Sequence, residues 1–445
     1  MGKYFGTDGY RGEAGITLTA DIAYRLGRIL GGMLCDGGKR GSVVIGKDTR
    51  LSCYMLEYAI ASGLAASGTD VYLLHVCTTP TVAYVTRTED FDMGIMISAS
   101  HNPYTDNGIK LMSSEGEKID DLFIEDIEKR MDEGRLPQAK IGEEIGKIVD
   151  HYSGRNRYIG YLISLSTHSF RNKKILLDCA NGGGWMIAPS VFSALGAKVV
   201  TIGTDPNGLN INREIGSTHI ETLKKRVVEE GCDLGLAFDG DGDRCIAVDE
   251  KGREVCGDRI MYILARRLKR EGKLHGNKLI CTIMSNPGLY RALKEEGIDY
   301  EQTTVGDRYV YERMREGGFS IGGEHSGHII LSRYATTGDG ILTGIKLVET
   351  LIEEKTALGT LREKVKLLPS ISLSVKVKDK SIARRKSVLE AKQQAEKSLG
   401  DYGRIIIRES GTEPVIRILA EAETIEEARR VAENLKSIIE SEEGI

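Results

Sequence analysis

Leu234-Gly235-Leu236-Ala237-Phe238 is followed directly by Asp239-Gly240-Asp241-Gly242-Asp243-Arg244 and then by Cys245-Ile246-Ala247-Val248. The two apolar runs have the length of buried strands, and the polar loop joins them. Glycine lets this loop turn tightly, so that its three carboxylates can converge. Converging carboxylates repel one another unless a hard cation lies among them, and oxygen ligands favour Mg²⁺ or Ca²⁺. The stretch therefore predicts a strand, a metal-binding loop and a second strand.

The acidic loop has two other interpretations besides a magnesium site. Asp at positions 1, 3 and 5 and Glu250 at position 12 fit an EF-hand, but position 6 is Arg244 where glycine is needed, and a strand follows instead of a helix. A solvated acidic turn is the simpler alternative, and it stays open at the level of the sequence.

The arrangement around this loop occurs three times along the chain. Apolar runs alternate with amphipathic stretches to predict strand, helix, strand, helix, and then two strands around a polar loop. The predicted strands are 43–45, 71–74, 93–97 and 109–112, then 174–177, 198–202, 234–238 and 245–248, then 279–283, 300–305, 319–321 and 328–331. The predicted helices are 52–67, a helix after Pro80, 185–195, 219–230, 288–296 and 307–316. Because α/β proteins place their chemistry in loops at strand ends, the three polar loops are the candidate site.

The last 75 or so residues follow a different order. Strands are predicted at 373–377, 404–407 and 415–419, with helices at 385–398 and 424–440. This order predicts a small α+β domain. We therefore expect an α/β protein of four domains, at 1–152, 153–254, 255–368 and 369–445, which fits a chain of 445 residues.

The polar loop of the first repeat is Ser98-Ala99-Ser100-His101-Asn102-Pro103. An exposed serine at a strand end can act as a nucleophile or a phosphate carrier. His101 is a poor general base for Ser100, because adjacent side chains in extended backbone point apart. A hydrolase is further disfavoured because the chain lacks Gly-x-Ser-x-Gly here. A loop-capping role is the simpler alternative for Ser100 taken alone.

The C-terminal domain contains Arg408-Glu409-Ser410-Gly411-Thr412-Glu413-Pro414, followed by Arg417. Backbone N–H groups around Gly411 can form an anion-binding nest, and Ser410 and Thr412 add hydroxyl donors. Arg408 and Arg417 supply forked, permanently charged donors that suit phosphate. The pattern favours a phosphate cradle over an ordinary Ser-Gly turn.

Other polar segments fit a sugar-phosphate site. In Glu324-His325-Ser326-Gly327-His328, Glu324 and Ser326 can bond sugar hydroxyls and His328 can exchange protons, although satisfied turn residues are an equal alternative. Thr7-Asp8-Gly9-Tyr10-Arg11-Gly12 is a glycine-rich loop with one arginine, and Lys110 follows the serine loop. Lys47-Asp48-Thr49-Arg50 ends the first strand and is expected to add two cations.

The composition excludes several classes of protein. Lys and Arg number 61 against 65 Asp and Glu, for a net charge of −4, so a general nucleic-acid binder is not expected. No apolar run reaches the roughly 18–20 residues of a membrane span, and the N-terminal residues do not read as a signal peptide. The eight cysteines form no Cys-x-x-Cys pair, so buried free thiols in a reducing cytoplasm are expected.

Taken together in this order, the motifs resemble those of the α-D-phosphohexomutase family. The resemblance spans the whole chain, and it rests on Gly6-Thr7-Asp8-Gly9, the Ser98–Pro103 loop, the Asp239–Arg244 loop, Gly323–His328 and Arg408–Pro414. It implies three related α/β domains and a smaller phosphate-binding domain around a central cleft.

The resemblance also implies a role for each candidate residue. Ser100 matches the family's phosphoserine, and its phosphate completes a Mg²⁺ site with Asp239, Asp241 and Asp243. Glu324 and Ser326 match residues that hold the sugar. The groups that lie near the reacting centre in the family correspond here to Arg11, Lys110, Arg244 and His328. The family's loop for the non-reacting phosphate corresponds to Arg408, Ser410, Gly411, Thr412 and Arg417.

The implied reaction interconverts glucosamine 6-phosphate and glucosamine 1-phosphate for cell-wall amino-sugar synthesis. It uses one Mg²⁺ per chain and a glucosamine 1,6-bisphosphate intermediate, with no nucleic-acid or membrane partner, and a homodimer is left open. The amino-sugar branch of the family commonly has valine or isoleucine at the position of Tyr10 and glutamine at the position of His325, so preference for glucose or mannose phosphate is the alternative. A non-catalytic sugar-phosphate or Ca²⁺ binder would not need Ser100, and a magnesium phosphatase would not need the second cradle.

Overall fold

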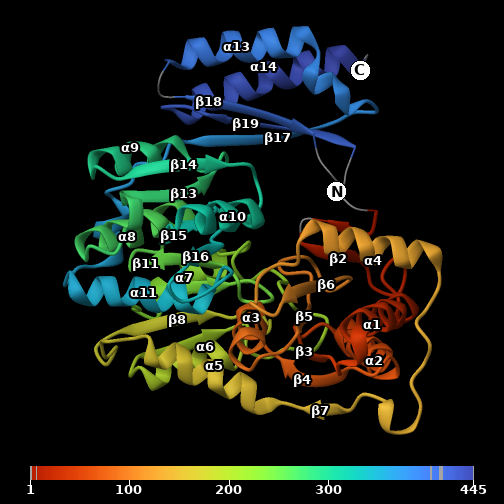
Figure 1. Ribbon diagram of the computed structural model, residues 1–445. Coiled ribbons are helices and arrows are strands. Elements are labelled where there is room, and N and C mark those ends of the chain that lie inside the picture. Colours follow the sequence, from red (N-terminus) through yellow and green to blue (C-terminus); the bar gives the residue numbers. More distant parts are fainter. Residues whose placement is uncertain (1–2, 7, 401–402, 410–413, 444–445) are drawn as a thin grey trace. The chain divides into compact units, whose positions relative to one another are not determined.

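The computed structural model describes residues 3–6, 8–400, 403–409 and 414–443. The chain divides into two compact units (Figure 1). The first unit comprises Met1–Met284 and Ile298–Glu363, and the second comprises Ser285–Gly297 and Lys364–Ile445.

The three sheets of the first unit repeat one topology. Their shared cores have the strand orders β6-β5-β3-β4, β11-β10-β8-β9 and β16-β15-β13-β14. In each core, three strands are parallel and the last strand of the repeat pairs antiparallel to its neighbour. The core strands are β3 (Ser42–Lys47), β4 (Asp70–Val76), β5 (Met93–Ile97), β6 (Asp106–Ser113), β8 (Lys174–Asp178), β9 (Lys198–Ile202), β10 (Leu234–Phe238), β11 (Cys245–Asp249), β13 (Lys278–Thr282), β14 (Asp299–Thr303), β15 (Ile321–Gly323) and β16 (Ile329–Leu331). The expected threefold repeat is thus confirmed.

Short strands extend the edges of two of these sheets. They are β1 (Phe5–Gly6), β2 (Gly9–Glu13) and β7 (Ile148–Asp150) on the first sheet and β12 (Glu254–Val255) on the second. The pairing of β2 with β6 sets Arg11 opposite Gly108 and brings the N-terminal loop beside the strand that carries Lys110.

The helices of the first unit connect these strands. They are α1 (Ala20–Leu34), α2 (Leu51–Ala66), α3 (Thr79–Thr88), α4 (Asp121–Glu133), α5 (Tyr152–Ser164), α6 (Ile187–Ala194), α7 (Glu221–Glu229), α8 (Gly257–Arg270), α10 (Asp307–Gly317), α11 (Gly340–Glu353) and α12 (Leu358–Arg362). Polar side chains start several of them: Thr19, Thr78, Asp120 and Asp339 each accept a backbone N–H in the first turn of α1, α3, α4 and α11. None of the described helices is both long and apolar enough to cross a membrane.

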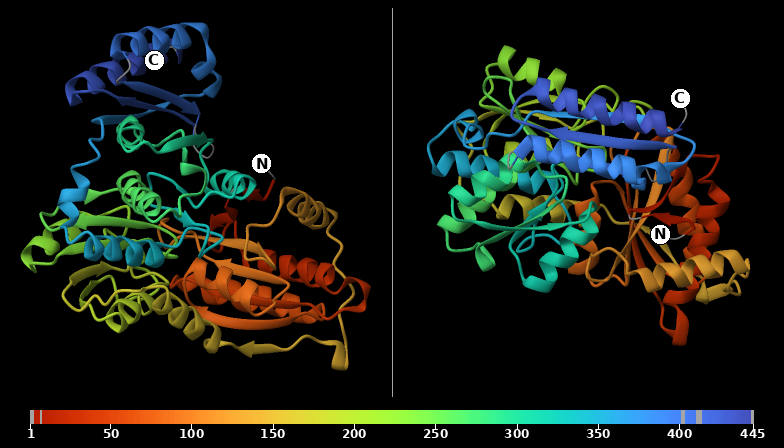
Figure 2. Two further views of the ribbon diagram at one scale, coloured as in Figure 1. Left: turned by 60° about the vertical axis from the view of Figure 1, so that its left-hand side comes forward. Right: turned by 90° about the horizontal axis from the view of Figure 1, so that it is seen from above.

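The second unit is a small α+β structure. Its antiparallel sheet has the order β17-β19-β18, with strands β17 (Ser370–Lys376), β18 (Arg404–Glu409) and β19 (Val415–Glu421). Helices α13 (Lys386–Leu399) and α14 (Ile425–Glu443) lie on one face of this sheet, as Figures 1 and 2 show. Helix α9 (Pro287–Glu295) belongs to the same unit, and its cap Asn286 donates to the Leu368 carbonyl and to Glu421 at 3.0 and 2.9 Å.

Several elements were not anticipated from the sequence. Helices α1, α5, α8 and α11 lie outside the repeated pattern of strands and loops, and they were not predicted from it. The charged stretch 125–133 forms most of α4, whose Ile127 and Met131 are buried against the first core.

Candidate active site

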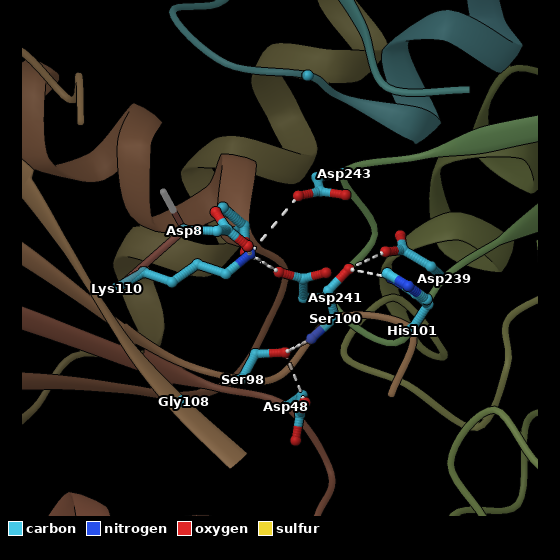
Figure 3. A network of polar contacts seen from close by, with 12 residues as sticks. Asp8, Asp48, Ser98, Ser100, His101, Gly108, Lys110, Asp239, Asp241 and Asp243 are labelled. Carbon is cyan, nitrogen blue, oxygen red and sulfur yellow. Dashed lines mark hydrogen bonds and ion pairs between the residues drawn. The ribbon is translucent and has the colours of Figure 1, made fainter. Parts of the chain in front are cut away.

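Ser100 occupies a bent position at the end of β5, and this position aims its hydroxyl at the acidic loop (Figure 3). Its φ is +53°, a left-handed conformation that costs a serine about 1–3 kcal/mol. Its Oγ donates to Asp239 Oδ2 at 2.6 Å, and its backbone N–H donates to Ser98 Oγ at 2.9 Å. Ser98 in turn donates to Asp48 Oδ2 at 2.7 Å. The network therefore ties a strained serine directly to a predicted metal ligand.

Arg50 holds the backbone of the serine loop. Its guanidinium is fully buried, pairs with Asp48 at 2.8 Å through Nε, and donates to four loop carbonyls, those of Ser100, Asn102, Pro103 and Asp106. A side chain used in this way cannot also bind a substrate anion. The expectation that Arg50 adds a cation to the site is therefore wrong, because its guanidinium is already bonded to Asp48 and to the carbonyls of the loop.

The same correction applies to Lys47. Its ammonium is fully buried, forms an ion pair with the equally buried Glu57, and lies 3.9 Å from the centre of the Tyr54 ring. A cation enclosed in this way supports the packing of α2 against β3 and does not face the site.

The three aspartates of the acidic loop converge as the sequence predicts. Each offers a carboxylate oxygen within 4.8 Å of the others, and all three are buried. Gly240 makes this approach possible, because a Cβ at that position would lie 2.5 Å from the Ser100 carbonyl oxygen. Gly242 adopts φ +70°, which continues the turn.

The electrostatics of the acidic loop fit a cation. Burial, and then the charges of Asp243 and Asp241, raise the pKa of Asp239 well above its ordinary value. Oδ1 of Asp241 and Oδ1 of Asp243 are buried and have no hydrogen-bond partner among the described residues. Buried carboxylate oxygens without donors are costly, and a bound divalent cation removes that cost. The donor set is all oxygen, as Mg²⁺ prefers.

Lys110 supplies positive charge beside the triad. Its Nζ lies 2.8 Å from Asp241 Oδ2, 3.2 Å from Asp8 Oδ2 and 3.7 Å from Asp243 Oδ2. Burial disfavours the ammonium, but the three carboxylates outweigh burial and raise the pKa of Lys110. Lys110 is therefore a fixed cation at neutral pH and not a proton acceptor. Arg11 also pairs with Asp8 from the neighbouring strand β2.

Arg244 completes the positive rim, and its contact with His328 links the second and third α/β repeats. Arg244 Nε lies 3.9 Å from both Asp239 and Asp243, and its backbone forms a β-bridge with His328. His328 Nδ1 lies 3.6 Å from Asp243, while its Nε2 accepts the Gly338 N–H at 3.0 Å. This hydrogen bond leaves the Nδ1 proton directed at Asp243.

Glu324 and Ser326 stand on the loop between β15 and β16. Glu324 Oε1 accepts the Gly306 N–H at 3.2 Å, which leaves its second oxygen for a ligand, and Ser326 Oγ has no partner among the described residues. The intervening His325 contacts Asp258 instead, with Nδ1 at 2.7 Å from Oδ2. The loop thus offers two groups for sugar hydroxyls: the second oxygen of Glu324, and Ser326 Oγ, which has no partner among the described residues.

Arg408 and Arg417 lie directly opposite each other on β18 and β19 of the second unit. Burial and the neighbouring Arg417 charge lower the pKa of Arg408, as expected for two cations held in register. Ser410, Gly411 and Thr412, the predicted core of the cradle, lie outside the described residues. Two arginines at opposed positions of adjacent strands suit a bound anion such as phosphate.

His101 differs from expectation. Because Ser100 is left-handed and not extended, the two side chains do not point apart, and Ser100 Oγ lies 3.4 Å from His101 Nδ1. Burial, followed by the charges of Arg244 and Arg11, lowers the pKa of His101 to about 4. A neutral imidazole therefore stands beside the serine hydroxyl, and the geometric reason for dismissing it was wrong.

Several polar and charged residues of the site were not predicted from the sequence. Asp8 lies inside the motif Thr7–Gly12, but the pattern gives it no role. Lys118 donates to Asp8 and to Asp307, both at 2.8 Å, and so joins the first repeat to the third. Thr79, at the start of α3, donates to Asp241. Local spacing carries no signal for these pairs, which are 110 or more residues apart.

Comparison with known proteins places this geometry in a family. Phosphoglucomutase/phosphomannomutase family models match four consecutive segments, namely alpha/beta/alpha domains I, II and III at residues 2–138, 156–252 and 256–367 and the C-terminal domain at residues 373–438. The phosphoglucosamine mutase of Lachnospira eligens is 52% identical over 447 residues, covering 99% of each chain. That of Bacillus subtilis is 45% identical over 448 residues, covering 100% of each chain.

Solved structures agree with the sequence relatives. A phosphoglucomutase/phosphomannomutase family protein from Burkholderia thailandensis has a TM-score of 0.82 and 25% identity, covering 99% of this chain and 98% of that one. N-acetylphosphoglucosamine mutase of Aspergillus fumigatus, in complex with GlcNAc-6P and magnesium, shares the fold, with a TM-score of 0.66, 17% identity and coverage of 99% and 96%. With matching domain models along its length and relatives about half identical to it from end to end, the chain belongs to the phosphoglucomutase/phosphomannomutase family, the α-D-phosphohexomutases.

Proposed function

We propose that this mutase interconverts glucosamine 6-phosphate and glucosamine 1-phosphate, with Ser100 as the carrier of the phosphoryl group. The observation that carries the role of Ser100 is its hydroxyl at 2.6 Å from Asp239, inside a buried carboxylate triad. The choice of sugar is supported by the name shared by relatives that are 45–52% identical over their full length.

In the proposed reaction, phosphoserine 100 gives its phosphoryl group to a free hydroxyl of the sugar. The bond from Ser100 Oγ to phosphorus breaks, a new oxygen–phosphorus bond forms, and the hydroxyl proton leaves to a base. The product is glucosamine 1,6-bisphosphate, which turns around so that its other phosphate returns to Ser100. Lys110, Arg11, Arg244 and His328 surround the reacting oxygens with positive charge and hydrogen-bond donors, the main requirement for phosphoryl transfer.

Mg²⁺ is the proposed cofactor, one per chain, held by Asp239, Asp241 and Asp243 with an oxygen of the serine phosphate. When bound there, it neutralises charge on the transferring phosphoryl group. The unpartnered oxygens of Asp241 and Asp243 support this assignment. The cation of Lys110 at 2.8 Å from Asp241 shares in the same neutralisation.

The remaining proposed roles concern the substrate. Glu324 and Ser326 bond sugar hydroxyls. The non-reacting phosphate is held by Arg408, Ser410, Gly411, Thr412 and Arg417. Because the substrate presents its phosphate from either end of the sugar, one cradle serves both orientations. The opposed pair of Arg408 and Arg417 supports an anion at this position.

The setting of the enzyme is also proposed. Four domains with the boundaries 1–152, 153–254, 255–368 and 369–445 fit the matched segments. A cytoplasmic location is supported by eight free cysteines, seven of them buried, which suit a reducing compartment. The partner is a small sugar phosphate, and a homodimer is the proposed assembly to test.

The deciding experiment compares kcat/KM for the phosphates of glucosamine, glucose and mannose, each with Mg²⁺ and a catalytic amount of the matching 1,6-bisphosphate. Glucosamine phosphate should be preferred, with measurable activity on glucose phosphate. A preference for glucose or mannose phosphate would assign the protein to the phosphomannomutase/phosphoglucomutase branch. The same comparison in His325→Gln tests whether His325 affects the choice of sugar. If the ratio of kcat/KM values for the sugars is unchanged, His325 has no role in that choice.

A further inference from the structure

Cys256, Asp258 and His325 form a second cluster of metal-ligating groups, apart from the aspartate triad. One ligand atom of each lies within 4.8 Å of the others, and within the described chain only this cluster and the triad meet that condition. Cys256 and Asp258 are buried at the start of α8, and His325 reaches them from the loop between β15 and β16. Cys256 and Asp258 lie in none of the sequence motifs, and the proposed phosphoryl transfer uses none of the three residues.

The two segments that carry the cluster are fixed to each other through their backbones. The Gly257 N–H donates to the His325 carbonyl at 3.0 Å. A Cβ at Gly257 would lie 2.2 Å from the Glu324 carbonyl oxygen and 2.7 Å from the Gly327 nitrogen. The start of α8 and the loop therefore approach as closely as backbone permits, which fixes the backbone positions of the three residues relative to one another.

The donor types differ from those of the aspartate triad. Thiolate sulfur, imidazole nitrogen and one carboxylate oxygen suit a borderline-soft divalent ion such as Zn²⁺, and thiolate is a poor ligand for Mg²⁺. Metal–ligand bonds of about 2.0–2.3 Å place tetrahedral ligand atoms roughly 3.3–3.7 Å apart. The 2.7 Å contact between His325 Nδ1 and Asp258 Oδ2 has to widen by only about 1 Å, and the half-exposed ring has room to move.

We propose that Cys256, Asp258 and His325 form a binding site for a borderline-soft divalent cation of the Zn²⁺ class. Three protein ligands leave the fourth position of a tetrahedral site for water. His325 stands between Glu324 and Ser326, so a cation that shifts the His325 ring away from Asp258 also displaces the loop proposed to hold the sugar. Occupation of the site is therefore expected to inhibit turnover.

The test uses the full-length enzyme saturated with Mg²⁺, so that the aspartate triad is occupied, and titrates it with Co²⁺ as a spectroscopic substitute for Zn²⁺. We expect one equivalent of Co²⁺ to bind and to give an intense sulfur-to-cobalt charge-transfer band. Cys256→Ser should lose the band while keeping its Mg²⁺-dependent activity, which shows that it is folded. His325→Gln should weaken Co²⁺ binding at least about tenfold.

Cys232→Ser is the matched control, because Cys232 is a buried thiol that belongs to no metal-ligating group among the described residues. It should keep the band. Zn²⁺ should inhibit the wild type and the control, and inhibit Cys256→Ser at least about tenfold more weakly. Absence of the band in the wild type, or its survival in Cys256→Ser, overturns the proposal. The spectrum needs no substrate, so its outcome is independent of the sugar that the enzyme prefers.

Discussion

Arg50 is the residue on which the geometry of the serine loop depends most. It is fully buried, and its guanidinium bonds to Asp48 and to four carbonyls of the loop that carries Ser100. The planar guanidinium of arginine has five N–H donors and can make all of these contacts, whereas the ammonium group of lysine cannot. The strained φ of Ser100 persists because these contacts leave the loop no other shape.

Arg50→Lys should therefore reduce activity and stability together. Loss of the carbonyl contacts leaves buried acceptors unpaired, and a weakened ion pair with Asp48 adds to the loss, for a total of about 3–5 kcal/mol. Thermal unfolding and kcat/KM measure the two effects. Arg25→Lys is the control, since Arg25 makes a single carbonyl contact, to Met131 at 3.2 Å, away from the site. Equal behaviour of the two variants would contradict the role assigned to Arg50.

Asp239 should make the metal-free enzyme sensitive to pH. Burial and two neighbouring carboxylates raise its pKa, so the folded state binds a proton more tightly than the unfolded state does. Its contribution to stability is thus present at low pH and is lost as pH rises toward the raised value. Asp239→Asn should raise the Tm of the metal-free enzyme at neutral pH, by roughly 2–4 °C for each 1 kcal/mol gained, and should abolish stabilisation by Mg²⁺.

Calorimetry offers a second readout of the same group. Binding of Mg²⁺ to the wild type should release protons and strengthen as pH rises, because metal and proton compete for Asp239. Asp239→Asn should release fewer protons. Proton release that is identical in the two proteins would exclude Asp239 as the competing group.

The residue that caps helix α11, Asp339, should make the stability of the fold depend on pH. Asp339 accepts the Leu342 N–H at 2.9 Å and the Tyr158 hydroxyl at 2.6 Å, which joins α11 to α5. Burial raises the pKa of Asp339 to about 6, and its two hydrogen bonds only partly oppose that rise. A charged cap in this position is therefore a cost to the fold at neutral pH.

Asp339→Asn should remove that cost while keeping the cap, since Asn also starts helices well. A carboxyl with a raised pKa stabilises below about pH 4, and this stabilisation is lost as pH rises through about 6. The variant should thus gain stability relative to wild type between these pH values, by an amount on the order of 3 kcal/mol. Chemical unfolding at a series of pH values checks this. A flat difference across that range would contradict it.

Strands β18 and β19 set Arg408 and Arg417 opposite each other, an arrangement of two forked cations that suits phosphate. Inorganic phosphate should raise the Tm of the enzyme, and Arg417→Ala should weaken binding of both the 1-phosphate and the 6-phosphate by about 1.5–3 kcal/mol. Lys376→Ala, which removes an exposed cation from β17, is the control and should leave binding unchanged. Loss of affinity for only one isomer would contradict a shared cradle.

At the level of the whole molecule, three copies of one sheet topology place polar loops at equivalent strand ends. The sequence predicts this repeated topology well, because each repeat contains apolar strands on both sides of a short polar loop. The triad and Ser100 were predictable for the same reason, since each motif is local. Arg50 was assigned wrongly, and Asp8 and Lys118 were given no role, because their partners lie in other segments and pattern alone does not show which charged groups meet.

The left-handed turn at Ser100 illustrates the same limit. From sequence, Ser100 and His101 read as extended neighbours, whereas clamping by Arg50 and by Asn212, which donates to the Ser100 carbonyl at 2.9 Å, imposes φ +53°. Asn212 is 112 residues away. Tertiary contacts of this range override local preference at functional sites.

Transfer of a phosphoryl group to Ser100 is the most direct test of the proposed chemistry. Mg²⁺-loaded enzyme, first dephosphorylated, is incubated with glucosamine 1,6-bisphosphate and examined by intact-protein mass spectrometry with peptide mapping. A single species about 80 Da heavier should form, with the added group on the peptide that contains Ser100. The same species should form in Ser62→Ala, an exposed serine on α2, and not in Ser100→Ala, which should also lose most turnover. Formation of that species on another residue, or full activity of Ser100→Ala, would contradict the assignment.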